Sequence, residues 1–262
     1  MLIGKAGKAT TAISTADAAS ITVRGKDLCS ELMGHVSFTE YFGLLLTGQP
    51  PTKEQVFFLD LLLVAIAEHG LVPTNQAARM TYAADPSSLQ SAVAAGILGC
   101  GSVILGTSQY CGEFLLAAAK ACDAAPGDDE AAVRSVARRI KSQGDKVPGF
   151  GHPVHKPLDP RAQRILELAE DASQSRFAHL ARVAERVVPE VWGKPLTMNV
   201  SMAIAAVLLD LGFPSGMLKS IPILARTASL LAHLAEEAEN PIGFLMASKA
   251  EAAIAYQPGD EA

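Results

Sequence analysis

The sequence has few aromatic residues, no surplus of positive charge and no long apolar run. Aromatic side chains make up 5% of the 262 residues, and the formal net charge is −5. Such a mildly acidic chain offers no basic surface, so we expect neither nucleic acid nor a membrane as a partner. No stretch approaches the roughly 18 uninterrupted apolar residues of a membrane-spanning helix. The N-terminus lacks the apolar core of a signal peptide, and we expect a cytoplasmic protein.

Cysteine is scarce, and its spacing does not fit the common zinc and disulfide patterns. The chain has four cysteines without a CxxC pair or an accompanying histidine cluster, namely Cys29, Cys100, Cys111 and Cys122. This spacing predicts buried, reduced thiols and no metal site.

Apolar residues, by contrast, make up 49% of the chain, and alanine is abundant. The runs 54–69 and 89–105 are apolar almost all round, which predicts two helices that are buried on several sides. The second run also carries small residues at spacings that permit close helix approach. The length suffices for one large domain or two unequal ones.

The most informative segment is GFGHPVHKPLDPRA, residues 149–162. Its glycines let the backbone adopt positive φ and come close to a ligand, so His152 is expected on a turn. Asp159 suits a helix N-cap and Pro160 the first helical position, which predicts a helix with Arg161 in its first turn. The histidine can hydrogen-bond a carbonyl oxygen while the guanidinium holds a carboxylate. A structural histidine in an ordinary turn is equally compatible with these residue types.

This segment resembles the signature of the citrate synthase family, in which GFGH is followed by a short basic stretch and DPR. Further segments between about residues 20 and 240 resemble the family in the same order. They are SITVRGKDL (20–28), FTEYFGLLLTGQPPTKEQ (38–55), AEHGLVPTNQAARM (67–80), TMNVSMAIA (197–205) and RTASLLAHLAEE (226–237). The resemblance implies an all-α fold, with a large helical domain formed by residues 1–113 and 195–262. A smaller domain, residues 114–194, would be inserted in it.

The resemblance also implies a substrate site. His152 would polarise a keto oxygen, His69 would bind substrate, and Arg226 would bind a carboxylate together with Arg161. Taken without the resemblance, His69 is interpreted as a structural residue that caps a helix end.

Coenzyme A, as part of a thioester, is the only cofactor that the resemblance implies. The smaller domain would close over it, with the backbone of residues 147–151 at the adenine and two lysines near the phosphates. The residues concerned are Lys146, Val147, Gly149, Phe150, Gly151 and Lys156. For the lysines, an ordinary solvated surface position is the other interpretation.

Two positions depart from the family pattern. Leu105 stands where the family has the histidine that polarises the acetyl thioester, and Ser201 stands at the aspartate that moves the α-proton. A serine without a partnering base has no acid–base capacity near neutral pH, so Ser201, Thr107, Ser108 or water are candidates for handling the proton. The family's Arg-Pro pair, contributed across a dimer interface, is not apparent in residues 239–244.

The short chain resembles the stand-alone citryl-CoA lyases. We therefore predict a carbon–carbon lyase that splits a citryl-CoA-type hydroxyacyl-CoA into acetyl-CoA and an oxo acid, with His152 and Ser201 as catalytic residues. The alternatives are a lyase or hydrolase for a different acyl-CoA and a non-catalytic, CoA-binding or regulatory protein. The family's helix pairing implies a homodimer or a higher homo-oligomer.

Overall fold

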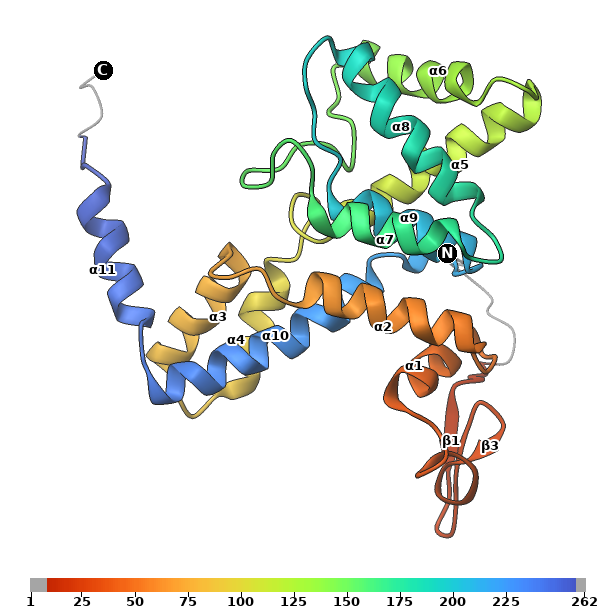
Figure 1. The fold of residues 1–262 in the computed structure, drawn as a ribbon. Coiled ribbons are helices and arrows are strands. Elements are labelled where there is room, and N and C mark those ends of the chain that lie inside the picture. The colour runs from red at the N-terminus through yellow and green to blue at the C-terminus, as the bar shows by residue number, and fades with distance from the viewer. Residues whose placement is uncertain (1–8, 258–262) are drawn as a thin grey trace. The chain divides into compact units, whose positions relative to one another are not determined.

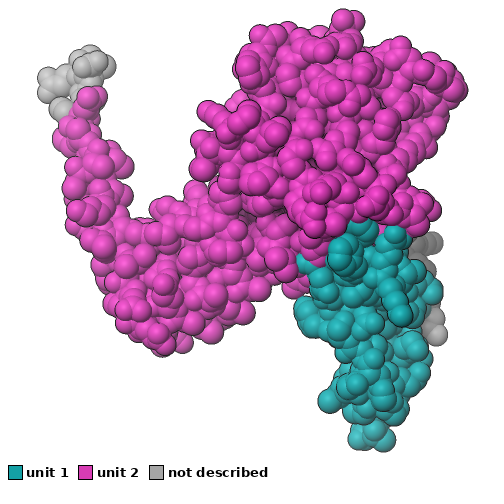
Figure 2. Space-filling model, in the orientation of Figure 1, with its two compact units in different colours: residues 1–60 teal, residues 61–262 magenta. Residues whose placement is uncertain are grey.

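The computed structural model describes residues 9–257, and the chain forms two compact units, residues 1–60 and 61–262 (Figure 2). Apart from one small sheet, the described elements are helices (Figure 1), so the predicted all-α class is confirmed. The strands are β1 (Ser14–Ala16), β2 (Ile21–Val23) and β3 (Lys26–Asp27). The helices are η1 (Leu28–Leu32), α1 (Phe38–Thr47), α2 (Lys53–Ala67), α3 (Pro73–Ala84), α4 (Leu89–Leu98), α5 (Thr107–Ala124), α6 (Asp129–Ser142), α7 (Pro160–Glu170), α8 (Arg176–Trp192), α9 (Val200–Asp210), η2 (Ser215–Met217), α10 (Ser220–Glu239) and α11 (Gly243–Ala253).

The first unit begins with an antiparallel sheet in the order β1-β2-β3. The turn between β2 and β3 places Arg24 and Gly25 at positive φ, as tight hairpins of this twist require. Ser37 caps α1 in a reciprocal capping box with Glu40. A small core joins the hairpin to α1 and is formed by Val23, Leu32 and Leu44.

The second unit contains two sets of helices that pack among themselves. In the first set α3 and α4 pack on each other and on α10, and α11 packs on α3. In the second set α5, α6, α7, α8 and α9 contact one another through several pairs. The breaks expected near residues 124–130, 143–153 and 192–195 coincide with the ends of α5, α6 and α8. The division at residues 114 and 194 into a large and a small domain stays a prediction.

The apolar run 89–105 is only partly helical, contrary to the expectation of one long helix. Helix α4 ends at Leu98, and a turn-rich segment leads to Gly106, directly before α5. Three glycines in eight residues raise the entropic cost of continuing the helix. The close helix approach is nevertheless real, because a Cβ on Gly96 would lie 2.7 Å from the Leu230 side chain of α10.

Helix α2 is less enclosed than its sequence indicates. Leu59, Leu62 and Ile66 are buried, whereas Val64 on the opposite face is 79% exposed. No helix among residues 9–257 is both long enough and apolar enough to cross a bilayer.

Candidate active site

The active loop, residues 149–157, is held by backbone pairing with the segment that leads into α9. Gly149 and Gly151 have φ of 76° and 92°, as the glycine pattern predicts. Gly151 N donates to Thr197 O (2.7 Å), and Asn199 N donates to Gly149 O (2.8 Å). A Cβ on Gly149 would lie 2.8 Å from Cys111 Sγ, so only glycine allows this packing. The pairing brings the loop beside the start of the helix that carries Ser201.

Helix α7 begins where the sequence predicts. Asp159 is its N-cap, and the Asp159 carboxylate receives hydrogen bonds from Arg161 N, Arg161 Nε and Arg161 Nη2. The same carboxylate accepts a hydrogen bond from Val200 N at the start of α9 (3.1 Å). Asp159 is fully buried, so this pairing fixes the guanidinium and ties two helix starts together. Because these bonds occupy Arg161, its guanidinium is less available for a bidentate contact with a substrate carboxylate than the sequence implies.

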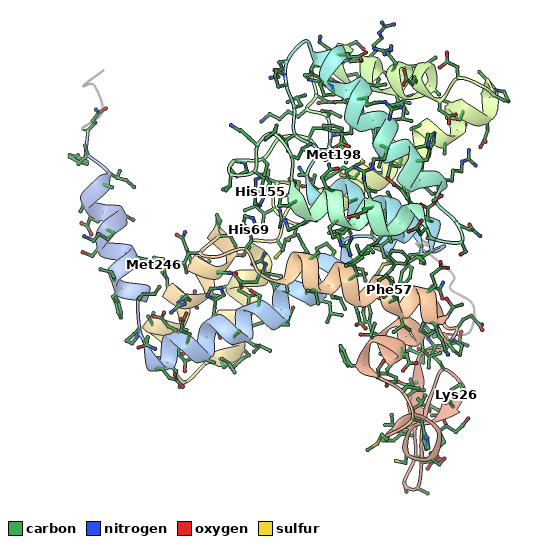
Figure 3. All side chains as sticks on the ribbon, in the orientation of Figure 1. Lys26, Phe57, His69, His155, Met198 and Met246 are labelled. Carbon is green, nitrogen blue, oxygen red and sulfur yellow. The ribbon has the colours of Figure 1, made fainter. Side chains whose placement is uncertain are left out.

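Three histidines converge at the active loop. His69, from the segment after α2, places its Nε2 3.1 Å from His155 Nε2 (Figure 3). The His152 ring centroid lies 4.4 Å from that of His155 and 5.5 Å from that of His69. The contact between His69 and His155 is not evident in the sequence, because 86 residues separate them.

The hydrogen bonds of His152 define which of its ring nitrogens carries the proton. Val154 N and His155 N both donate to His152 Nδ1, at 3.1 and 2.9 Å. A neutral ring that accepts at Nδ1 carries its hydrogen on Nε2. His152 Nε2 lies 3.4 Å from Arg161 Nη2, so two donors face each other. A ligand oxygen between them would accept from both.

One nitrogen from each of the three histidines lies within 4.8 Å of the other two, which is a spacing compatible with metal binding. A metal ligand must offer a lone pair. His152 as placed offers a proton at Nε2, and the Arg161 cation lies next to it. This arrangement suits an oxygen-bearing, negatively charged ligand better than a cation.

Arg226, in the second turn of α10, is 2% exposed. Its Nη1 donates to Asn75 Oδ1 (3.1 Å), and its Nη2 approaches Ile66 O at 3.5 Å. Its Nε is buried and makes no hydrogen bond to any described residue. An unpaired buried donor is costly, and a carboxylate would satisfy it.

A cavity of about 200 Å³ gathers these groups. Polar side chains line one part of it, and apolar side chains from residues 103–105 line another. The polar lining residues are His69, Thr107, His152, Arg161, Asn199, Ser201 and Arg226. All five predicted substrate-site and catalytic residues are thus brought together. Ser108, an alternative for handling the proton, is buried and donates to Leu105 O (3.3 Å), and it is not among the lining residues.

Leu105 lies in this cavity with φ of 64°, a left-handed conformation that is uncommon for leucine. Strained backbone of this kind concentrates at functional sites. The side chain is buried and apolar, so the wall it forms neither donates nor accepts a hydrogen bond.

The electrostatic setting favours the neutral forms of His69 and His152. Burial lowers the pKa of His69, and the Arg161 cation and His155 lower it further. Burial and the neighbouring His155 likewise lower the pKa of His152. Burial alone would raise the pKa of Asp159, but the hydrogen bonds and charge of Arg161 hold it below its ordinary value. The site therefore combines neutral imidazoles with guanidinium cations.

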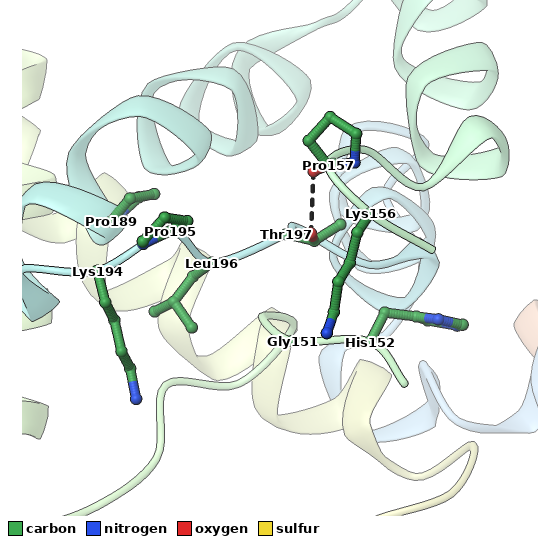
Figure 4. A pocket seen from close by; sticks show the side chains of 9 residues that line it. All are labelled: Gly151, His152, Lys156, Pro157, Pro189, Lys194, Pro195, Leu196 and Thr197. Atoms are coloured by element: carbon green, nitrogen blue, oxygen red, sulfur yellow. Dashed lines mark hydrogen bonds between the residues drawn. The ribbon is translucent and has the colours of Figure 1, made fainter. Parts of the chain in front are cut away.

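A second, larger cavity of about 880 Å³ also borders the active loop. It shares Gly151 and His152 with the smaller one and extends over prolines to two lysines, Lys156 and Lys194 (Figure 4). Thr197 Oγ1 donates to Pro157 O across its wall (2.9 Å). Of the residues expected at coenzyme A, Gly151 and Lys156 line this cavity. The others do not: Lys146 is exposed, Val147 and Gly149 are buried, and Phe150 is half-buried.

Lys194 and Glu68 are two residues that the sequence did not single out for the site. Lys194 lies within the predicted break at residues 192–195, and no other feature of the sequence pointed to it. Glu68 precedes His69 and accepts hydrogen bonds from Ser229 Oγ and from the backbone of Gly70. Its Oε2 lies 3.0 Å from His233 Nε2. These contacts connect the His69 segment to α10, the helix that carries Arg226.

Solved structures share this helical fold. Citryl-CoA lyase from Hydrogenobacter thermophilus superimposes with a TM-score of 0.83 and 26% identity, covering 98% of this chain and 97% of that one. ATP citrate lyase from Methanothrix soehngenii, solved with citrate and coenzyme A, has the same fold at a TM-score of 0.77 and 20% identity, covering 99% of this chain and 43% of that one.

A family model described as "Citrate synthase, C-terminal domain" matches residues 51–243, well over half of the sequence. The chain belongs to the citrate synthase family. The citrate/2-methylcitrate synthase of Bacillus subtilis (strain 168) is 29% identical over 212 residues, which are 78% of this chain and 54% of that protein. The chain therefore spans about half the length of the curated relatives it matches.

Proposed function

We propose that this protein cleaves a citryl-CoA-type hydroxyacyl-CoA thioester into acetyl-CoA and an oxo acid. The observation that carries the proposal is the convergence of His152 Nε2 and Arg161 Nη2, 3.4 Å apart, in the cavity that also holds Arg226. Cleavage turns the substrate hydroxyl into a carbonyl, and these two donors stabilise the negative charge that develops on that oxygen. The unpaired Nε of Arg226 is the partner for a carboxylate of the oxo acid.

The larger cavity is the proposed site of coenzyme A. Its apolar floor of prolines and Leu196 suits the adenine and pantetheine parts. Lys156 and Lys194 come from separate segments and carry positive charge for the phosphates (Figure 4). The two cavities share the lining residues Gly151 and His152, and we propose that the thioester passes from one to the other at the active loop.

Acetyl-CoA release from citryl-CoA tests this proposal. The wild-type chain is expected to release acetyl-CoA, and His152→Ala to lose activity by a factor on the order of 100 or more because it removes the oxyanion donor. His179→Ala, at an exposed histidine of α8, is the matched control and should keep full activity. Coenzyme A binding without acetyl-CoA release from citryl-CoA would overturn the proposed substrate, and no binding at all would favour a non-catalytic role.

The apolar wall supports a second candidate, cleavage of a different hydroxyacyl-CoA. Leu105 and the neighbouring Val103 and Ile104 surround part of the small cavity, where a polar oxo acid gains no hydrogen bond. A less polar acyl group would bury apolar surface there. Leu105→His should then shift the preference toward citryl-CoA, measured as the ratio of kcat/KM for citryl-CoA and for a methylated analogue. An unchanged ratio would argue against this candidate.

A further inference from the structure

We propose that His69 and His155 act as a pair that carries the substrate proton, with His69 exchanging it with substrate and His155 positioning His69 and sharing its charge. The inference rests on the cleavage proposed above. It assigns a role to His155, which the family resemblance does not explain. It also names the group that replaces the acid–base function absent at Ser201.

The need for such a group follows from the lining of the small cavity. Among the described residues that line it, none is an aspartate or a glutamate. Ser201 and Thr107 have hydroxyl groups, which do not accept a proton near neutral pH without a base. His152 already carries its hydrogen on Nε2 and uses Nδ1 to accept two backbone N–H groups, so it donates but is not free to take a proton. Of the lining residues, this leaves His69 to serve as the base.

His69 is arranged for proton transfer in both directions. Its Nε2 is engaged with His155 Nε2 at 3.1 Å, so Nδ1 is the ring nitrogen left for a ligand. A neutral pair shares one hydrogen between the two Nε2 atoms. When His69 carries it, its Nδ1 has a free lone pair, and His155 accepts at Nε2. This is the relation between a general base and its orienting partner.

The proton and electron count balances over the cycle. His69 Nδ1 takes the hydroxyl proton, while its Nε2 hydrogen moves to His155, which becomes the imidazolium. The alkoxide electron pair forms the carbonyl of the oxo acid, and the carbon–carbon bond breaks to give the thioester enolate. The proton then returns through His69 to the enolate carbon, giving acetyl-CoA. Hydroxyl oxygen and enolate carbon are bonded to the same carbon in the substrate, so one group can serve both.

Charged and titratable groups from several elements surround His69 and His155. His152 belongs to the active loop, Arg161 to α7 and Arg226 to α10, and all three line the small cavity. Asp159 and Glu68 supply negative charge, but both carboxylates are engaged, Asp159 with Arg161 and Glu68 with Ser229. A substrate carboxylate entering the cavity would add negative charge beside the pair and would favour proton uptake by the pair when it is needed.

The test uses His155→Gln and His155→Glu, with His179→Gln as the matched control. Glutamine can accept the His69 hydrogen bond but cannot take the proton, whereas glutamate can do both. We expect His155→Gln to lower kcat for acetyl-CoA release at least about tenfold across the pH range, with little change in KM, and His155→Glu to recover part of the loss. A purely structural role would make glutamine the better replacement of the two. Equal kcat values for acetyl-CoA release in wild type and His155→Gln would overturn the role of the pair in proton transfer.

A second measurement does not depend on turnover. Nitrogen NMR of the free wild-type protein should show scalar coupling across the N–H···N bond between the two Nε2 atoms, and the coupling should vanish in His155→Gln. Its absence in wild type would overturn the pair even if the enzyme is active. If the coupling is present but wild type releases no acetyl-CoA from citryl-CoA, the proposed cleavage fails, and the role in proton transfer fails with it.

Discussion

At the residue scale, the site contains donors whose hydrogen-bonding capacity is only partly used. His152 Nε2 and Arg161 Nη2 face each other at 3.4 Å, and Arg226 Nε is buried without a partner among the described residues. Unsatisfied buried donors reduce stability unless a ligand completes them. The arrangement is therefore better explained by binding of an anionic, oxygen-rich ligand than by a structural role.

Arg226→Lys tests the carboxylate part of this argument. Lysine keeps the charge but loses the planar fork, so oxaloacetate should bind about 10-fold to 100-fold more weakly. Calorimetric titration with oxaloacetate measures the change. Arg164→Lys, at an exposed ion pair with Glu167, is the control and should leave the affinity unaltered. Equal oxaloacetate affinities in the two variants would show that Arg226 does not bind the substrate carboxylate.

His69 and His152, which are both half-buried, also predict how stability depends on pH. Their pKa values in the folded protein lie below the ordinary value of 6.5, first because of burial. The unfolded chain thus binds these protons at higher pH than the folded chain does. Their contribution to the free energy of unfolding is complete above about pH 6.5 and declines as the pH falls through the folded pKa values. Urea unfolding between pH 7.5 and 5.5 should show this decline, and the His69→Gln, His152→Gln double variant should show a shallower one.

At the scale of elements, local sequence signals predicted the beginnings of structure better than the ends. Asp159 and Pro160 correctly marked the start of α7, because capping depends on residues next to each other in sequence. The end of α4 at Leu98 was missed, since the apolar pattern continues past it to Leu105. The predicted site residues did gather, but their contacts with His155 and Glu68 arise from tertiary packing, which no local pattern in a single sequence specifies.

The pairing of the active loop with the segment before α9 depends on Gly149. Gly149→Ala would combine a left-handed backbone with a Cβ 2.8 Å from Cys111 Sγ, so we expect a loss of about 2–5 kcal/mol in the free energy of unfolding. Gly144 also has positive φ, but a Cβ there would meet nothing within 4 Å. Gly144→Ala should therefore cost only the backbone part, about 1–2 kcal/mol. Urea unfolding of both variants makes the comparison, and equal losses would contradict the packing argument.

At the scale of the whole molecule, the single chain leaves large apolar side chains in solvent. Val64 on α2 and Leu98 on α4 are 79% and 85% exposed. Isolated exposed apolar side chains are common, but side chains exposed to this extent on a chain with 49% apolar residues are also expected where a partner covers the surface. A homodimer is the assembly that we propose, because a two-fold interface buries the same residues in both copies.

Sedimentation equilibrium should therefore give twice the mass of one chain. Val64→Glu would place an unpaired charge in the interface and should raise the dimer dissociation constant at least about tenfold, because such a charge is costly to desolvate. In an isolated monomer the same substitution would be harmless, since the side chain already faces water. Gln90→Glu, at an exposed polar position of α4, serves as the matched control with the same added charge. Equal dimer dissociation constants for Val64→Glu and Gln90→Glu would show that the face of α2 that carries Val64 is not the interface. A wild type that sediments with the mass of one chain would contradict the dimer itself.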